Sequence, residues 1–398
     1  MGETYDIVVA GGSIAGLAFA AEASKRGLRI LVAEEHPEVG EPEKCDGLVS
    51  LRGLRKYGYA PAEAVIQDRI ASAVVHSPAG KELAIGASSL EVVVLDRSEF
   101  DKQVAKAAME NGAEIRTGAR VSSALEKDRS VEVKVADTVV RSKYYVDATG
   151  PSSSPRQGIL PAAKYEIEGD WVREHVVELF MDADSYPGFF AWVIPYGNRA
   201  AKVGAAGHGI NPFRALDGFL SSRPSTILRK VSAPIYVGGP TSSFVEGRRI
   251  LVGESAGQVK PTTAGGIMTS VAGAAIAAKW ASISIERNQP ELLANYQPEW
   301  ESAFLGEMRT MLRLRGVLEK LSNADLDGVL GTLSTPKLKQ KLSNSDFDFH
   351  GTGILGALGV SGVLRIAKVV ASAEVRSLLV EGLLSKTGAK KSSREQKP

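Results

Sequence analysis

The sequence has few of the residues that disulfides, metal centres and nucleic-acid interfaces need. It contains one cysteine, Cys45, in 398 residues, which excludes an internal disulfide and a cysteine-rich zinc site. This cysteine usage fits a reducing compartment, so we expect a cytoplasmic protein. The five histidines are scattered without an HExxH pair, so we expect no metal. The net charge of +2 provides no strong electrostatic attraction for nucleic acid, and we expect no such partner.

Apolar runs long enough to cross a bilayer are also missing. The C-terminal part has a shorter apolar run, from Ile354 to Leu364, after which charged residues recur. This run is too short to cross a bilayer, but it can lie in the membrane interface as an amphipathic helix or pack on the core. The composition, 44% hydrophobic and 24% charged residues, is typical of folded soluble proteins. The length predicts two to three domains.

Glycines, in contrast, are clustered, and the first cluster lies between two predicted strands. Residues Asp6–Ala10 form a β-branched apolar run, a glycine-rich turn follows at Gly11–Gly16, and an alanine-rich stretch predicts a helix. No basic segment or cleavage site precedes the first strand, so we expect no signal peptide. A second apolar strand, Leu28–Ala33, ends at Glu34 and Glu35. These carboxylates are placed to accept hydrogen bonds from ribose hydroxyls, which favours FAD or NAD over NADP.

Each residue of the turn has a physical reason to be where it is. Gly11 permits the tight turn, and Gly16 lets the helix pack closely on the strand. The helix N-terminus, with Ser13 and Ala15, offers free N–H groups to a pyrophosphate. Ser13 replaces the second glycine of the usual motif, and its small side chain can itself bind phosphate. The segment therefore predicts a dinucleotide site.

Three further segments add to this pattern. Leu95–Asp101 opens a predicted helix that runs on to Gly112, and strand-like residues return at Val121. Tyr145–Gly150 ends a strand in a glycine turn, with Ser153 and Arg156 beyond it. Arg249–Gly257 ends another strand, which leads to Pro261, to Gly265, Gly266 and Ile267, and to a helix of small residues reaching Trp280.

The set of segments resembles the flavoprotein group of p-hydroxybenzoate hydroxylase and, within it, the geranylgeranyl reductase family, which includes archaeal digeranylgeranylglycerophospholipid reductases. The resemblance covers nearly the whole chain. It implies an α/β fold in which a Rossmann-type FAD-binding domain is interleaved with a sheet-containing substrate domain and followed by C-terminal helices. It also implies that FAD is the cofactor, and that these residues contact it: Arg97, Val121, Gly150, Gly253, Glu254, Gly257, Pro261, Gly265, Gly266 and Ile267. Glu254 stands where the family usually has aspartate.

Two other segments resemble the reductases in particular. Pro42–Gly47 is similar to a cysteine-glycine loop beside the isoalloxazine ring, although one residue shorter, which implies that Cys45, Asp46 and Gly47 lie at the flavin. Tyr186–Pro195 is similar to the aromatic stretch that lines the isoprenoid pocket, where a hydrocarbon is recognised by shape and apolar burial. Strand alternation would place Phe190, Trp192 and Ile194 on one face. The candidate substrate-binding residues are Tyr186, Phe190, Trp192 and Pro195.

Structural roles for these residues stay open at this point. A lone cysteine is more often a small buried apolar residue than a reactive group, and an aromatic stripe is more often core than pocket. His208, at the end of a predicted strand, is interpreted as structural.

The resemblance implies a reaction in outline. Reduced flavin would deliver a hydride equivalent from N5 to one alkene carbon, and a proton would go to the other. Cys45 is the one proton donor to which the sequence points, and bound water is an equal contender. The electron donor is NAD(P)H or ferredoxin, the substrate is an isoprenoid lipid, and we expect a monomer that is cytoplasmic and able to contact the membrane face.

The domain prediction is discontinuous. The FAD-binding domain takes residues 1–70, 95–160 and 245–297, and the substrate domain takes 71–94 and 161–244. A helical region at 298–385, with helices expected at Glu299–Leu321 and Leu326–Leu342, precedes a polar, basic tail at 386–398.

Three functions are weighed. The first is a flavin-dependent isoprenoid reductase that saturates C=C bonds of geranylgeranyl chains. The second is an aromatic hydroxylase or tryptophan-halogenase-like enzyme that uses O2, because the stretch Phe190–Pro195 also resembles the halogenase Trp-x-Trp-x-Ile-Pro motif with its first tryptophan replaced. The third is a flavin-binding protein without turnover.

Overall fold

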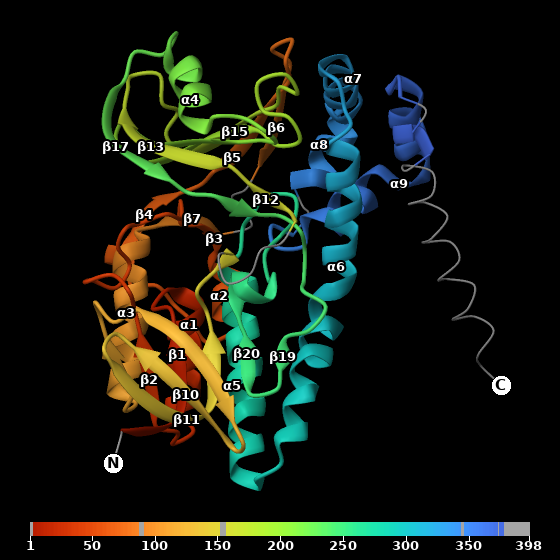
Figure 1. Cartoon of the computed structure of the whole chain (residues 1–398). Coiled ribbons are helices and arrows are strands. Elements are labelled where there is room, and N and C mark those ends of the chain that lie inside the picture. Colours follow the sequence, from red (N-terminus) through yellow and green to blue (C-terminus); the bar gives the residue numbers. More distant parts are fainter. Residues whose placement is uncertain (1–2, 87–90, 152–156, 344–345, 373, 378–398) are drawn as a thin grey trace, which may run out of the picture. The chain divides into compact units, whose positions relative to one another are not determined.

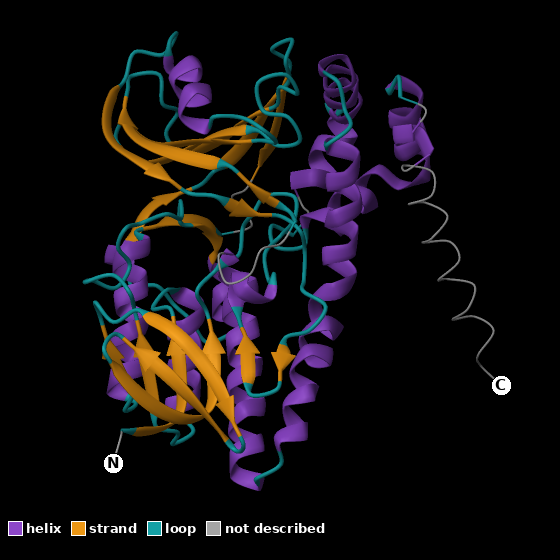
Figure 2. Cartoon of the chain, in the orientation of Figure 1, coloured by secondary structure: helices purple, strands orange, loops and turns teal. Residues whose placement is uncertain are grey.

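The computed structural model describes residues 3–86, 91–151, 157–343, 346–372 and 374–377 (Figure 1). It is a mixed α/β structure with sheets followed by C-terminal helices, so the predicted fold class is confirmed (Figure 2). The chain divides into two compact units, residues 1–67, 93–159 and 235–308 in the first and 68–92, 160–234 and 309–398 in the second. The residues Ser153 and Arg156 and the tail at 386–398 lie outside the described residues.

The elements of the first unit, in chain order, are β1 (Thr4–Ala10), α1 (Ile14–Ser24), β2 (Ile30–Ala33), β3 (Leu48–Ser50), α2 (Leu51–Arg55), α3 (Arg97–Glu110), β8 (Glu114–Arg116), β9 (Val121–Lys127), β10 (Ser130–Val135), β11 (Thr138–Asp147), β18 (Ile235–Tyr236), β19 (Val245–Glu246), β20 (Arg249–Leu251) and α5 (Ile267–Arg287). Short 3₁₀ helices lie at Glu63–Val65, Gly253–Ala256 and Pro290–Asn295. Three strands cross or adjoin the boundaries between the units: β4 (Ile66–Arg69), β7 (Val92–Leu95) and β12 (Ile159–Leu160).

The elements of the second unit are β5 (Ser72–His76), β6 (Glu82–Gly86), β13 (Ala162–Glu168), β14 (Val176–Phe180), β15 (Ala191–Gly197), β16 (Ala200–Ala206), α4 (Pro212–Leu220), β17 (Thr226–Ser232), α7 (Asn323–Leu333), α8 (Pro336–Ser343) and α9 (His350–Val369). Helix α6 (Tyr296–Leu318) begins in the first unit and ends in the second.

The first unit is built on a parallel sheet in the order β20-β11-β1-β2-β8, with β19 at one edge. Strand β2 is buried throughout, as its apolar sequence requires when both faces of a parallel sheet are covered. Helix α1 packs against α3 and α5. On the other side, the β9-β10 ribbon pairs with the first half of β11 and buries residues of β1 and β2 such as Val8 and Leu31 against Val133.

The second unit is built on a seven-stranded sheet in the order β17-β13-β16-β15-β14-β5-β6, antiparallel except between β14 and β5. One face of this sheet packs on α4 through Tyr165, Val193, Val203, Leu216 and Phe219. Strand β7 is absent from it and joins β3 instead, so the sequence grouping of residues 71–94 with the substrate sheet was wrong for its last strand.

The C-terminal helices differ from expectation in two places. The stretch Leu326–Leu342, predicted as one helix, is broken between α7 and α8, where Pro336 begins the new helix. Helix α9 is longer than the apolar run, with a non-helical residue at Gly359. By length and composition both α5 and α9 could cross a membrane, but 72% of the α5 window is buried inside the protein, against 33% for α9.

Candidate functional site

The glycine turn after β1 admits no side chain at two positions. A Cβ atom on Gly11, whose φ is +103°, would lie 2.5 Å from the carbonyl oxygen of Ala148. A Cβ on Gly16 would lie 2.0 Å from the carbonyl oxygen of Gly11. Strand, turn and helix therefore approach as closely as their backbones allow, which leaves the turn open for a bulky ligand.

The N-terminus of α1 keeps its amide groups available. Ser13 is the N-cap residue in extended conformation, but its side chain forms no capping hydrogen bond to the helix. Its hydroxyl donates instead to Asp101 Oδ2 at 3.1 Å, from helix α3. Within the described residues, the first-turn amides of α1 therefore lack an N-cap side chain as acceptor, which is the condition under which a pyrophosphate binds there.

Arg97 and Asp101 form a buried ion pair beneath Ser13. The guanidinium Nη2 of Arg97 lies 2.9 Å and 3.1 Å from the two carboxylate oxygens of Asp101. Burial lowers the pKa of Arg97, but the charge of Asp101 and the interaction with Cys45 outweigh it and hold the pKa above its ordinary value. Arg97 therefore stays cationic next to the helix N-terminus, where an anion would sit.

The acidic residue at the end of β2 is fixed by local bonds. Glu34 is 8% exposed, and its Oε2 accepts a hydrogen bond from the amide of Gly12 at 2.6 Å. Its Oε1 accepts from the amide of His36 at 2.8 Å and lies 2.6 Å from that histidine's Nδ1. A carboxylate accepts about four hydrogen bonds, so capacity remains for a ribose hydroxyl. Glu35 is exposed, and its side chain lies 3.5 Å from Arg120.

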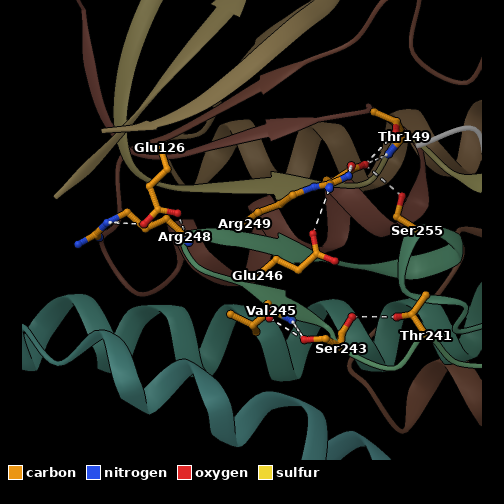
Figure 3. A network of polar contacts seen from close by, with 10 residues as sticks. Glu126, Thr149, Thr241, Ser243, Val245, Glu246, Arg248, Arg249 and Ser255 are labelled. Atoms are coloured by element: carbon orange, nitrogen blue, oxygen red, sulfur yellow. Dashed lines mark hydrogen bonds and ion pairs between the residues drawn. The ribbon is translucent and has the colours of Figure 1, made fainter. Parts of the chain in front are cut away.

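The second and third glycine motifs are tied together by a network of polar side chains that includes Thr149, Arg249 and Ser255 (Figure 3). The Oδ1 atom of Asp147 accepts hydrogen bonds from the amide and hydroxyl of Thr149 at 3.1 Å and 2.7 Å. Its Oδ2 accepts from Arg249 at 2.5 Å. Ser255 accepts from the amide of Gly150 at 3.0 Å, and its hydroxyl lies 3.2 Å from Asp147 Oδ1. The end of β11 is thereby fixed to the 3₁₀ turn after β20.

The third motif also touches the first. A Cβ on Gly253, whose φ is +64°, would lie 2.5 Å from the side chain of Ala15 in α1. Glu254 Oε1 accepts a hydrogen bond from the amide of Tyr236 at 3.1 Å. Two motifs about 240 residues apart in sequence therefore meet at the first turn of α1.

The remaining residues of the third motif surround the start of α5. Gly257 has φ +68°, and a Cβ there would lie 2.1 Å from the carbonyl oxygen of Gly239. Pro261 is buried, Gly265 accepts a hydrogen bond from the amide of Lys260, and Gly266 caps the helix that begins at Ile267.

The cysteine loop lies against the start of α3. Gly47 has φ +81°, and a Cβ there would lie 2.1 Å from the carbonyl oxygen of Leu95. The amide of Leu95 donates to the carbonyl of Gly47 at 3.0 Å. Cys45 is exposed and interacts with Arg97. Asp46, the next residue of the loop, is half-buried. Val121 is half-buried at the first residue of β9.

The aromatic residues named from the sequence lie in the second unit. Tyr186, Phe190 and Trp192 are 6%, 7% and 9% exposed, and Pro195 is buried. Phe190 precedes β15 by one residue, but its ring meets that of Trp192 edge-on, with centroids 6.1 Å apart. The Phe190 ring also stacks on Phe189, with centroids 4.1 Å apart.

Trp192 lies across the neighbouring strand. A Cβ on Gly204 of β16 would lie 2.1 Å from Trp192 Cζ2, so the indole occupies the space that the glycine leaves. Trp192 pairs with Gly204 in the β15-β16 register, and Val193 pairs with Val203. Because alternate residues point to opposite faces, Trp192 projects from the face opposite the α4 core to which Val193 belongs.

Sequence reasoning gave no role to Asp101, Ser255 and Phe189. Asp101 follows Arg97 by four residues, a spacing that places both on one helix face and signals the pair. No local pattern marks Ser255, because its partners Asp147 and Gly150 lie more than 100 residues earlier in the sequence. Phe189 lies within the aromatic stretch, but its stacking on Phe190 could not be read from the sequence.

Comparison with known proteins adds two kinds of similarity. Residues 6–153 match the family model of FAD-dependent oxidoreductases, which confirms the predicted cofactor. The chain is 30% identical over 360 residues to digeranylgeranylglycerophospholipid reductase 2 of Methanopyrus kandleri, covering 83% of this chain and 90% of that protein.

Solved structures share the fold. A geranylgeranyl bacteriochlorophyll reductase-like protein from Thermoplasma acidophilum matches with a TM-score of 0.83 and 22% identity, covering 94% of this chain and 99% of that one. A flavin-dependent brominase matches with a TM-score of 0.67 and 16% identity, covering 99% and 100%. Since reductase-like and halogenating proteins share this architecture, the fold alone does not choose between them.

Proposed function

Because the chain belongs to the digeranylgeranylglycerophospholipid reductase family, we propose that it is an FAD-dependent reductase that saturates C=C bonds of geranylgeranyl chains in membrane lipids or their precursors. One observation carries this choice over the oxygen-using alternative, namely the 30% identity to a named reductase across most of both chains. A match over that share of the chain includes its central part, and with it the aromatic stretch around Trp192.

FAD, when bound and reduced, supplies the hydride for the alkene. The chain's residues have the task of binding and orienting. The amides after Ser13 and the cation of Arg97 suit the pyrophosphate, and Glu34 suits the adenosine ribose. The backbone around Gly253 and Gly150 suits the rest of the cofactor, since neither glycine leaves a side chain in the way. The rings of Phe190 and Trp192 provide apolar surface for an isoprenoid chain.

The proton for the second alkene carbon is assigned to Cys45 or to water that it orders. The thiol is exposed and interacts with Arg97. An alkene has no carbonyl that could hold negative charge, so the proton must arrive early or together with the hydride. Cys45→Ser keeps a small donor and Cys45→Ala removes it, so the pair separates chemistry from packing.

The decisive experiment uses purified protein, reduced anaerobically with dithionite and mixed with a geranylgeranylated glycerophospholipid. We expect the flavin absorbance to return as the lipid gains one hydrogen pair per saturated bond, measured by mass spectrometry. Cys45→Ala should slow this reoxidation more than Cys45→Ser, with equal FAD content. A flavin that stays reduced with lipid but hydroxylates or halogenates an aromatic compound in air would instead support the alternative function.

The protein is proposed to act at the cytoplasmic face of a membrane, and helix α9 is proposed to contact the lipid surface. Val360, Leu364 and Val369 on this helix are 56%, 45% and 45% exposed. Arg365 and Lys368 are exposed beside them. Apolar and basic side chains on one exposed surface suit an anionic lipid interface.

Sedimentation with anionic vesicles tests the membrane contact. Val360→Ser with Leu364→Ser should reduce the bound fraction severalfold, whereas Leu125→Ser, at an equally exposed leucine of β9, should not. If the α9 double variant binds the vesicles as well as Leu125→Ser does, α9 does not form the membrane contact. NADPH and reduced ferredoxin, supplied in turn in place of dithionite, identify the electron donor.

A further inference from the structure

Arg315 is a buried cation that the reactions described above do not use. It lies in the last turn of α6, with its side chain 5% exposed. Among the described residues, neither of its terminal nitrogens, Nη1 and Nη2, makes a hydrogen bond of good geometry. The Oε1 atom of Glu319 lies 2.8 Å from Nη2 and forms an ion pair with it. A buried guanidinium presents five N–H donors, so most of this capacity is unused.

The surroundings of Arg315 are built around the aromatic stretch. Its guanidinium carbon lies 5.7 Å from the centre of the Phe189 ring. Phe189 in turn stacks on Phe190 and meets Trp192 edge-on, with centroids 4.1 Å and 6.2 Å apart. A cation therefore stands at the end of the aromatic cluster to which the isoprenoid chain is assigned.

Glu319 is held between two cations or potential cations. The same Oε1 atom that faces Arg315 lies 3.2 Å from Nε2 of His208, whose side chain is 53% exposed. The approach needs Gly188, because a Cβ there would lie 2.7 Å from the His208 ring and 3.1 Å from Glu319 Cγ. Glu319 thus has a second partner to which it can turn when an anion competes for Arg315.

We infer that Arg315 binds the anionic phosphate headgroup of the lipid whose hydrocarbon chain contacts the aromatic cluster. This inference rests on the proposed function. A lipid with an apolar chain and a phosphate can make two favourable interactions here. The guanidinium is suited to bidentate binding of the phosphate, and the aromatic rings are suited to packing against the chain. The glutamate then leaves Arg315 for His208 and makes room for the phosphate.

The test compares two lipids that differ only in the phosphate: the geranylgeranylated glycerophospholipid and its dephosphorylated, neutral counterpart. Arg315→Met should raise KM for the phospholipid about 10- to 100-fold and leave KM for the neutral lipid unchanged. Arg315→Lys should restore part of the preference. Glu319→Gln removes the competing carboxylate and should lower KM for the phospholipid severalfold. Arg309→Met, at an exposed arginine of the same helix, is the matched control.

The same variants are also assayed for equilibrium binding of each lipid by quenching of tryptophan fluorescence. If the wild-type protein binds the lipids but reduces neither, the proposed function fails, and the binding preference for the phospholipid still decides the role of Arg315. An equal loss of both lipids in Arg315→Met would show that the arginine only supports Phe189. A wild-type protein without preference for the phospholipid would overturn the inference.

Discussion

The candidate sites of the two units are shaped in different ways, one by the backbone and the other by side chains. In the first, the geometry is set by backbone: a Cβ atom on Gly11 would collide with the turn that follows β11, and one on Gly253 would collide with helix α1. In the second, it is set by side chains: the rings of Phe190 and Trp192 contact neighbouring rings, and the Trp192 indole fills the space that Gly204 leaves. A nucleotide carries phosphates that backbone amides bind, whereas a hydrocarbon offers only shape and apolar surface.

The largest effect is expected from Gly11→Ala. Alanine at φ +103° is strained, and its Cβ would lie 2.5 Å from a backbone oxygen that cannot move away alone. We expect protein purified without flavin, with FAD affinity reduced at least roughly 100-fold, which corresponds to about 3 kcal/mol. Absorbance of the purified protein and titration with FAD measure it.

Gly27→Ala is the control for the first substitution. Gly27 follows α1 and has φ +80°, but no atom of the described residues outside its own neighbours lies within 4 Å of its Cβ position. It therefore carries the backbone strain without the collision, and the variant should retain FAD. Flavin loss in both variants would mean that the turn is sensitive to strain anywhere, and that close approach at Gly11 is not the cause.

The next largest effect is expected from Gly204→Ala in the second unit. The new Cβ would lie 2.1 Å from Trp192 Cζ2, so the indole must move, at a cost of about 1–3 kcal/mol. We expect normal FAD content and a KM for the lipid about tenfold higher. Gly218→Ala in α4, where the Cβ meets no other part of the described structure within 4 Å, should leave both the FAD content and KM unchanged. Loss of flavin in Gly204→Ala would contradict the separation of roles between the units.

The same contrast explains what the sequence could predict. The glycine turn is a local pattern: strand, turn, helix and Glu34 follow one another, and each has its own chemical signature. The stacking of Phe189 on Phe190 depends on where β15 begins, and the cation at Arg315 comes from a helix more than 100 residues later. The contact of Arg315 with Phe189 joins distant segments and leaves no periodic signal, and whether two adjacent rings stack depends on the local backbone, so both contacts required the structure.

The smallest effect is expected from Ser255→Ala, which tests whether backbone alone holds the first unit's site. Ser255 is 1% exposed, and its hydroxyl connects the amide of Gly150 with the carboxylate of Asp147. Its loss leaves the Gly150 amide without this acceptor, at a cost of about 1–2 kcal/mol in the free energy of unfolding. Urea unfolding with bound FAD measures that cost.

The FAD affinity of Ser255→Ala shows whether the backbone or the side-chain network positions the cofactor. If the glycine backbone positions the cofactor, FAD affinity should fall less than about tenfold, because Gly253 and its contact with Ala15 are untouched. Ser255→Thr provides the matched comparison, since it keeps the hydroxyl and adds a methyl group to a buried position. A loss of FAD as complete as that in Gly11→Ala would show that the side-chain network around Asp147 sets this site too, and the difference between the two units would then be one of degree.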